Sequence, residues 1–423
     1  MPSKAFGEFV EHAENTPRMT AQEVKARLDA GEKVVILDSR PLAEYRNMSI
    51  PGGIDCPGAE LVYRVHDIVR APDALVVVNC AGRTRSIIGA QSLINAGIPN
   101  RVVALKDGTM GWHLAGFELA RGQNRLAPKP TQSGLTRARQ AAARVATRFG
   151  VRTIDVATVA RFAQEMERRT LYLFDVRSPE EYAAGHLHST VNAPGGQLVQ
   201  ATDAFAATRN ARIVLIDDNG VRATMTASWL IQMGWKEVYV VKDALKSGPL
   251  LQGLPEPEVL GLEQVRCEYI TAQDLNLELD AGNATVLDFD TSLRYRDSHI
   301  PGAWFAIRAN LEQNLEQIPH AKLLVLASPD GIIARLAAPE AARLTRIPVK
   351  VLRGGTDSWR AAGLPVETGM THLADSSDDV RYRPYDRTDK VEEAMQDYLN
   401  WEVNLVKQIE RDDDVDFRTF ARV

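Results

Sequence analysis

Residues 36–45 read ILDSRPLAEY, and residues 173–182 read LFDVRSPEEY. A weaker third copy places Asp288, Asp290 and Tyr295 at the matching positions. Each copy is a short aliphatic run that ends in Asp and is followed by a turn and a helix-forming stretch. This internal repeat indicates one structural unit that occurs three times along the chain.

A second aliphatic run follows about forty residues after each of these Asp residues, at 75–79, 213–216 and 323–327. Each copy also opens on a residue that can cap a helix, namely Thr20, Asp155 and Thr271. Thr20 and Glu23 together form a capping-box pattern. Buried strands that alternate with helices favour a parallel sheet covered on both faces. We therefore predict an α/β protein of three tandem domains, each a mostly parallel sheet flanked by helices.

The composition excludes several classes of protein. Of the 423 residues, 45% are hydrophobic and 25% are charged, and the net charge is −5. This balance is typical of globular domains and does not favour a nucleic-acid or anionic-membrane partner. The N-terminus lacks the apolar core of a signal peptide. Three cysteines, an odd number, fit free thiols in a reducing compartment, so we expect a cytoplasmic protein.

The clearest candidate for chemistry is the loop at residues 79–86, which reads NCAGRTRS. It lies where a buried run gives way to a helix-forming stretch. Backbone N–H groups and the positive end of the helix dipole would therefore surround the Cys80 thiol. Such surroundings favour the thiolate and hold a bound anion. We expect Cys80 to be the nucleophile and the next six residues to hold the substrate: Ala81, Gly82, Arg83, Thr84, Arg85 and Ser86.

These motifs resemble those of the rhodanese family of sulfurtransferases. The matching segments are 38–45, 50–53, 80–85 and 108–112, and the last of these recurs in the third copy at 355–359. The layout resembles bacterial multi-repeat thiosulfate sulfurtransferases with four repeats. On that interpretation, one repeat is missing at the N-terminus here.

The resemblance implies that the protein moves sulfane sulfur from thiosulfate or a related donor through a Cys80 persulfide. The acceptor would be cyanide, a small thiol or a sulfur-carrier protein, and no metal or organic cofactor is implied. Asp38 and Arg40 would support the loop. Asp217 and Ser328 stand at the Cys80 position in the other two copies and cannot form a persulfide.

The expected organisation follows from these assignments. It comprises a catalytic repeat at 1–122, a basic helical linker at 123–152, an inactive repeat at 153–250, a linker at 251–268, an inactive repeat at 269–369 and a helical tail at 370–423. The tail carries an apolar stripe that would dock on a domain of the same chain or on a second protomer. A homo-oligomer is therefore one possible state. For the basic linker, a helix salt-bridged to acidic neighbours is favoured over RNA binding.

Two alternative functions remain open from the sequence. Some phosphatases share this fold and its loop cysteine, but their loop, as the resemblance implies, encloses five residues before its Arg. Here Cys80 and Arg85 enclose four. The other alternative is a non-catalytic scaffold of degenerate repeats. We expect His186 and His299, which match Ser49 in the first copy, to be structural. His186 and His188, separated by Leu187, could suggest a metal pair, but no further ligand cluster lies nearby and we expect them to be structural.

Overall fold

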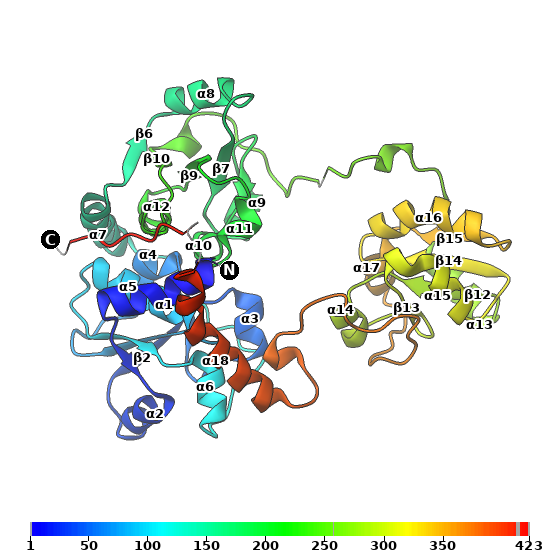
Figure 1. The fold of residues 1–423 in the computed structure, drawn as a ribbon, viewed down its shortest axis with the longest axis horizontal. Helices are drawn as coiled ribbons and strands as arrows, with labels where there is room; N and C mark the ends of the chain where they lie inside the picture. Colours follow the sequence, from blue (N-terminus) through cyan, green and yellow to red (C-terminus); the bar gives the residue numbers. More distant parts are fainter. Residues whose placement is uncertain (1, 257, 412–414, 422–423) are drawn as a thin grey trace. The chain divides into compact units, whose positions relative to one another are not determined.

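The protein contains three parallel five-stranded sheets, each flanked by helices (Figure 1). The computed structural model describes residues 2–256, 258–411 and 415–421. All neighbouring strands within these sheets run parallel. The prediction of three tandem α/β domains followed by a C-terminal helix is confirmed.

The first repeat has the strand order β1-β5-β4-β2-β3. Its strands are β1 (Arg18–Met19), β2 (Val34–Asp38), β3 (Ile54–Asp55), β4 (Leu75–Asn79) and β5 (Val102–Leu105). Its helices are α1 (Pro2–Glu14), α2 (Ala21–Asp29), α3 (Leu42–Asn47), α4 (Glu60–Ile68), α5 (Thr84–Asn95) and α6 (Gly108–Leu114). All five residues of β4, the central strand, are buried, and Cys80 follows directly at the carboxyl edge of the sheet.

The second repeat has the equivalent order β6-β10-β9-β7-β8. Its strands are β6 (Arg152–Ile154), β7 (Leu171–Asp175), β8 (Val191–Asn192), β9 (Arg212–Ile216) and β10 (Val238–Val241). Its helices are α8 (Val156–Gln164), α9 (Pro179–Ala184), α10 (Gly195–Gln200), α11 (Thr202–Phe205), α12 (Val221–Gln232) and the 3-10 turn η1 (Ala244–Lys246). The loop between β9 and α12 therefore corresponds to the Cys80 loop.

The third repeat has the order β11-β15-β14-β12-β13. Its strands are β11 (Glu268–Ile270), β12 (Ala284–Asp288), β13 (Trp304–Phe305), β14 (Leu323–Ala327) and β15 (Val349–Leu352). Its helices and 3-10 turns are η2 (Leu262–Gln264), α13 (Ala272–Asp280), α14 (Ser292–Asp297), η3 (Arg308–Asn310), α15 (Leu311–Gln317), α16 (Ile332–Leu344) and α17 (Gly355–Ala361), with η4 (Pro384–Asp386) beyond it.

The residues expected to cap the first helix of each repeat do so. The Thr20 hydroxyl accepts the Glu23 N–H while the Glu23 carboxylate accepts the Thr20 N–H, a complete capping box. Asp155 and Thr271 each accept the N–H three residues ahead. Side-chain oxygens thus satisfy amides that the first turn of a helix leaves unpaired.

The compact units do not follow the repeats one by one. One unit comprises residues 1–255 and 392–423, and the other comprises 256–391. In the first unit, α7 (Gln132–Phe149) packs against α4 and α12, one helix from each of the two repeats. Beyond Gly134, its buried face consists of Ala138, Ala141, Ala142, Val145 and Phe149. These residues join both repeats in one hydrophobic core.

The arginines of α7 act differently from the expected surface ion pairs. Arg137 donates to the carbonyl oxygen of His66, and Arg144 donates to that of Ala96. Arg148 does form an ion pair, with Glu14 of α1 at 2.7 Å. The basic helix therefore fastens the first unit together mainly through backbone acceptors.

The tail helix α18 (Val391–Ile409) docks on the first unit through Met395, Leu399 and Leu405, which are buried. The buried face shares only Leu405 with the apolar stripe seen in the sequence, whose other members are half-buried: Val391, Ala394, Tyr398, Trp401 and Ile409. Within the described ranges, no helix is both long and apolar enough to cross a membrane.

Candidate active site

The Cys80 loop joins β4 to α5 at the carboxyl edge of the first sheet, and Cys80 is 2% exposed. The N–H of Thr109 donates to the Cys80 carbonyl at 2.7 Å, and that of Met110 donates to the Ala81 carbonyl at 2.9 Å. In a trans peptide the next N–H points opposite to the carbonyl. The amides of Ala81 and Gly82 therefore point away from α6.

Two further contacts shape the loop. Gly108, at φ +56°, lies so close to the loop that a Cβ would collide with the carbonyl oxygens of Cys80 and Gly82. Glycine is required there both for its positive φ and for this close approach. The Ser86 hydroxyl donates to Cys80 Sγ at 3.2 Å. A hydroxyl donor on the sulfur stabilises negative charge there.

Buried polar residues support the strand ends beneath the loop. Arg40 binds Asp38 through two hydrogen bonds of 2.8 and 2.7 Å, and both side chains are essentially inaccessible. Asn79, which precedes Cys80, donates to Asp38 Oδ2 at 3.1 Å. Asp38 and Arg40 are thus linked to Cys80 through Asn79, the residue before the cysteine. Arg40 also donates to the carbonyl of Met48.

Arg83 faces carboxylates. Its guanidinium binds Glu8 at 2.7 and 2.8 Å, Glu11 at 2.7 Å and Asp107 at 3.2 Å. Burial alone would lower the pKa of Arg83, but the hydrogen bonds and charges of Glu8, together with Glu11 and Asp107, outweigh it and raise the pKa. Arg83 therefore ties the loop to α1, which differs from the expected position against the donor.

Arg85 reaches a different partner. It pairs with Glu44 of α3 at 2.7 and 3.0 Å and also contacts Gln197 of the second repeat at 3.4 Å. Glu44 belongs to the first repeat's 36–45 motif. The motif and the Cys80 loop, separated in sequence, thus meet at this ion pair.

In the second repeat, a carboxylate fills the corresponding loop. Asp217 Oδ1 accepts the N–H groups of Asn219 at 3.3 Å and Gly220 at 2.6 Å, and Oδ2 accepts that of Ala223 at 3.1 Å. Burial raises the pKa of Asp217, opposed by Arg222 and these amides. The loop geometry thus directs three amides at the side-chain carboxyl group of its first residue.

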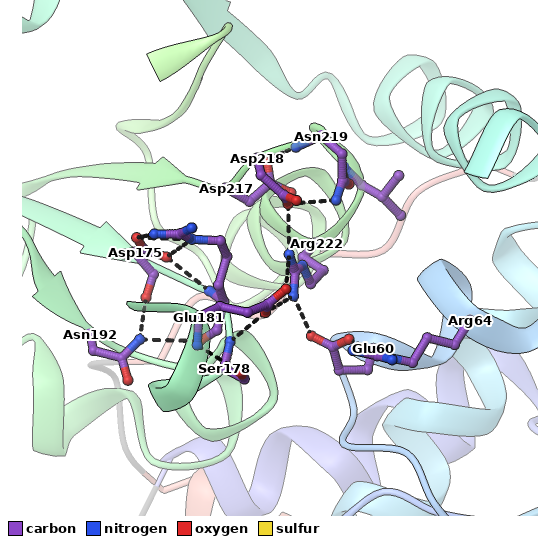
Figure 2. Close-up of polar contacts among 12 residues, drawn as sticks. Glu60, Arg64, Asp175, Ser178, Glu181, Asn192, Asp217, Asp218, Asn219 and Arg222 are labelled. Carbon is purple, nitrogen blue, oxygen red and sulfur yellow. Dashed lines mark hydrogen bonds and ion pairs between the residues drawn. The ribbon is translucent and has the colours of Figure 1, made fainter. Parts of the chain in front are cut away.

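Figure 2 shows the ion pairs of Arg222, the arginine of the second loop. Arg222 matches Arg85 in register and is fully buried. It binds Glu181 and Asp218 of its own repeat and Glu60 of the first repeat, at 2.5 to 2.7 Å (Figure 2). Its pKa is raised, because Glu60 and Glu181 outweigh the lowering effect of burial.

The third loop has no carboxyl group at its first position and no arginine at its sixth. The Ser328 hydroxyl accepts the Ala334 N–H at 3.3 Å, and Ile333 stands where the other loops have an arginine. Asp290 replaces the arginine beneath the loop, so Asp288 has no cationic partner of that kind. Burial, with the nearby Asp290 charge, raises the pKa of Asp288 to about 7.

The other histidines and cysteines considered in the sequence make packing contacts. His186 and His299 stack on Tyr182 and Tyr295 at 4.0 and 3.8 Å, and each Nδ1 contacts the tyrosine carbonyl. Cys56 is completely buried, and burial raises its pKa. Among the residues that the structure describes, no group of three or more His, Cys, Asp or Glu side chains could hold a metal ion.

The structure also brings residues to the loop that the sequence did not single out. Glu8 and Lys4 come from α1, and Tyr398 and Glu402 from α18. Glu402 lies more than 300 positions from Arg83, so no local pattern links them. The sequence signal for Glu402 was its position one helical turn after Tyr398, a member of the apolar stripe, which places both side chains on the docking face of the tail helix.

Comparison with known proteins gives three matches to the Rhodanese-like domain model, at residues 20–115, 158–247 and 271–362. A crystal structure of a thiosulfate sulfurtransferase from Pseudomonas aeruginosa is 49% identical, with a TM-score of 0.89. The alignment covers 99% of this chain and 79% of that chain.

Curated relatives match over shorter stretches. An HTH-type transcriptional regulator, Rv0324 from Mycobacterium tuberculosis, is 34% identical over 104 residues, which is 25% of this chain and 45% of that protein. A tRNA uridine(34) hydroxylase from Buchnera aphidicola is 29% identical over 84 residues, 19% of this chain and 27% of that protein. The chain thus spans less than half the length of these two relatives.

Proposed function

This chain belongs to the rhodanese family, and we propose that it is a sulfurtransferase that carries sulfane sulfur as a persulfide on Cys80. The observation that carries the proposal is the comparison of the three loops. In the other two, the side-chain oxygen of Asp217 or Ser328 accepts loop amides. Only the first loop presents a sulfur at this position, in a ring suited to an anion.

The proposed reaction has two displacement steps. The Cys80 thiolate attacks the outer sulfur of thiosulfate, a new S–S bond forms, and the old S–S bond breaks as sulfite leaves with the electron pair. A nucleophile such as cyanide, a small thiol or a carrier protein then attacks the outer sulfur, and Cys80 leaves as the thiolate. The oxidation level of the chain is the same at the start and the end of the cycle.

The chain's own residues have separate parts in this proposal. The amides of Ala81 and Gly82 and the Ser86 hydroxyl hold the anionic persulfide. Asp38 and Arg40 brace the strand end, and Arg83 fixes the loop to α1. The 49% identity to a thiosulfate sulfurtransferase supports thiosulfate as the donor. The three free cysteines fit a cytoplasmic setting.

The test compares sulfur with phosphate chemistry on the wild-type protein. We expect thiosulfate-dependent formation of thiocyanate from cyanide and no hydrolysis of p-nitrophenyl phosphate above the Cys80→Ser background. A loop with four residues between Cys80 and Arg85 suits a single sulfur atom better than three phosphate oxygens. Cys80-dependent cleavage of the phosphate would establish the phosphatase alternative. If the protein shows neither activity, the non-catalytic scaffold is the alternative that remains.

A further inference from the structure

The tail helix α18 brings a carboxylate onto the Cys80 loop. Glu402 is 1% exposed. Its Oε2 accepts the N–H of Arg83 at 3.2 Å, and its Oε1 accepts the hydroxyls of Thr84 and Tyr398, each at 3.2 Å. A Cβ built on Gly82 would lie only 2.6 Å from Glu402 Oε2. The carboxylate therefore lies directly on the backbone of the loop.

The second repeat identifies the amide that Glu402 takes. Arg83 lies three residues after Cys80, and Gly220 lies three residues after Asp217. The Gly220 N–H makes the shortest amide contact to the Asp217 carboxylate, at 2.6 Å. Glu402 thus accepts the amide whose counterpart in the second repeat binds the side-chain carboxyl group of the first loop residue. This contact puts a buried carboxyl group against one of the amides that the proposed donor would use.

The charges around Glu402 come from several elements. Lys4 and Glu8 face it from α1, Thr84 from α5 and Tyr398 from its own helix. Burial raises the pKa of Glu402, whereas Lys4 acts to lower it. Burial lowers the pKa of Lys4, and the charges of Glu402 and Cys80 oppose that shift. One lysine therefore lies within electrostatic reach of both Glu402 and the cysteine.

The tail holds α18 in this position from both its face and its far end. Three apolar side chains of the helix are buried on the first unit. Beyond it, Phe417 packs against Phe6 and Phe9, and Phe420 packs against Phe149, with ring centroids 5.0 to 5.3 Å apart. The backbone N–H of Arg418 also donates to the Gln232 carbonyl at 2.8 Å. Glu402 is thus a built part of the site.

We infer that Glu402 is a specificity-determining residue of the Cys80 site, a carboxylate that weakens the binding of small dianionic donors by competing for the loop amides. The inference rests on the proposed function. A donor with two negative charges meets both the occupied amide and the repulsion of a buried carboxylate, where Coulomb interactions are weakly screened. Donors with less negative charge, such as alkyl persulfides, suffer less from it.

The experiment measures thiosulfate kinetics in the full chain with Glu402→Gln. This change removes the charge and keeps the shape and an oxygen acceptor. We expect the KM for thiosulfate to fall at least about tenfold with kcat within about threefold, because the charge acts on donor binding. Glu402→Met should lower KM similarly and serves if the glutamine variant does not fold. Glu402→Asp keeps the charge and should lower KM much less.

A second readout does not depend on turnover. Sulfate is a dianion that cannot donate sulfur, and it should protect Cys80 from iodoacetamide at an about tenfold lower concentration in Glu402→Gln than in wild type. Asp397→Asn, an exposed charge change on the same helix, is the matched control and should behave as wild type. Equal protection in wild type and Glu402→Gln, or an unchanged or raised KM, would overturn the inference. Absent thiosulfate turnover in wild type would instead count against the proposed function.

Discussion

Replacing Cys80 with serine is expected to reduce thiosulfate-to-cyanide transfer by at least about 10³-fold, because a serine hydroxyl cannot carry the persulfide. No other loop can compensate, since Asp217 and Ser328 occupy the equivalent positions. The measurement is the initial rate of thiocyanate formation by the full chain. The Ser86 contact and the buried supports beneath the loop are compatible with serine, so the fold should survive.

The other two cysteines provide the controls for this variant. Cys56→Ala and Cys267→Ser should retain most of the activity, because Cys56 lies in the core of the first unit and Cys267 packs against the core of the third repeat. Substantial transfer by Cys80→Ser would mean that sulfur moves through another group. Loss of activity in all three variants would point to a shared effect on folding.

The second large effect concerns stability. Arg40→Ala should lower the free energy of unfolding of the first unit by about 3–5 kcal/mol, because it leaves the Asp38 carboxylate buried without its cation. The pair is 0% and 1% exposed, so water cannot take the place of the arginine. Chemical denaturation of the full chain, followed through the transition of the first unit, measures the loss.

A double variant distinguishes the loss of the ion pair from the cost of leaving the Asp38 carboxylate buried without a partner. Asp38→Leu with Arg40→Met removes both charges and fills similar space, so it should be much less destabilised than Arg40→Ala alone. A loss below about 1 kcal/mol in Arg40→Ala would show that Asp38 does not need the arginine. Arg177 binds Asp175 in the same way and offers the equivalent comparison in the second repeat.

The repeated motif was sufficient to predict the fold because its information is local. The aliphatic runs ending at Asp38, Asp175 and Asp288 became the strands β2, β7 and β12, and the capping residues began the expected helices. The Cys80 loop was also recognisable, since strand, glycine and helix start lie within a few residues. Loop position therefore followed from patterns that short-range physics enforces.

Contacts between distant segments could not be read in the same way. The arginines of α7 suggested a solvated helix, yet the alanines at 138, 141 and 142 pack it between two repeats. That small-residue stripe was visible in the sequence, but its two partners were not. The partners of Arg83 and the position of Glu402 depend on how α1 and α18 dock, which no local spacing reports.

The most direct test of the account is intact-protein mass spectrometry after thiosulfate treatment, followed by peptide mapping under non-reducing conditions. The peptide that contains Cys80 is expected to gain one sulfur atom and to lose it when cyanide is added. Cys80→Ser should show no gain. An unmodified Cys80 peptide in a protein that turns over thiosulfate, or a stable sulfur on Cys56 or Cys267 instead, would contradict it.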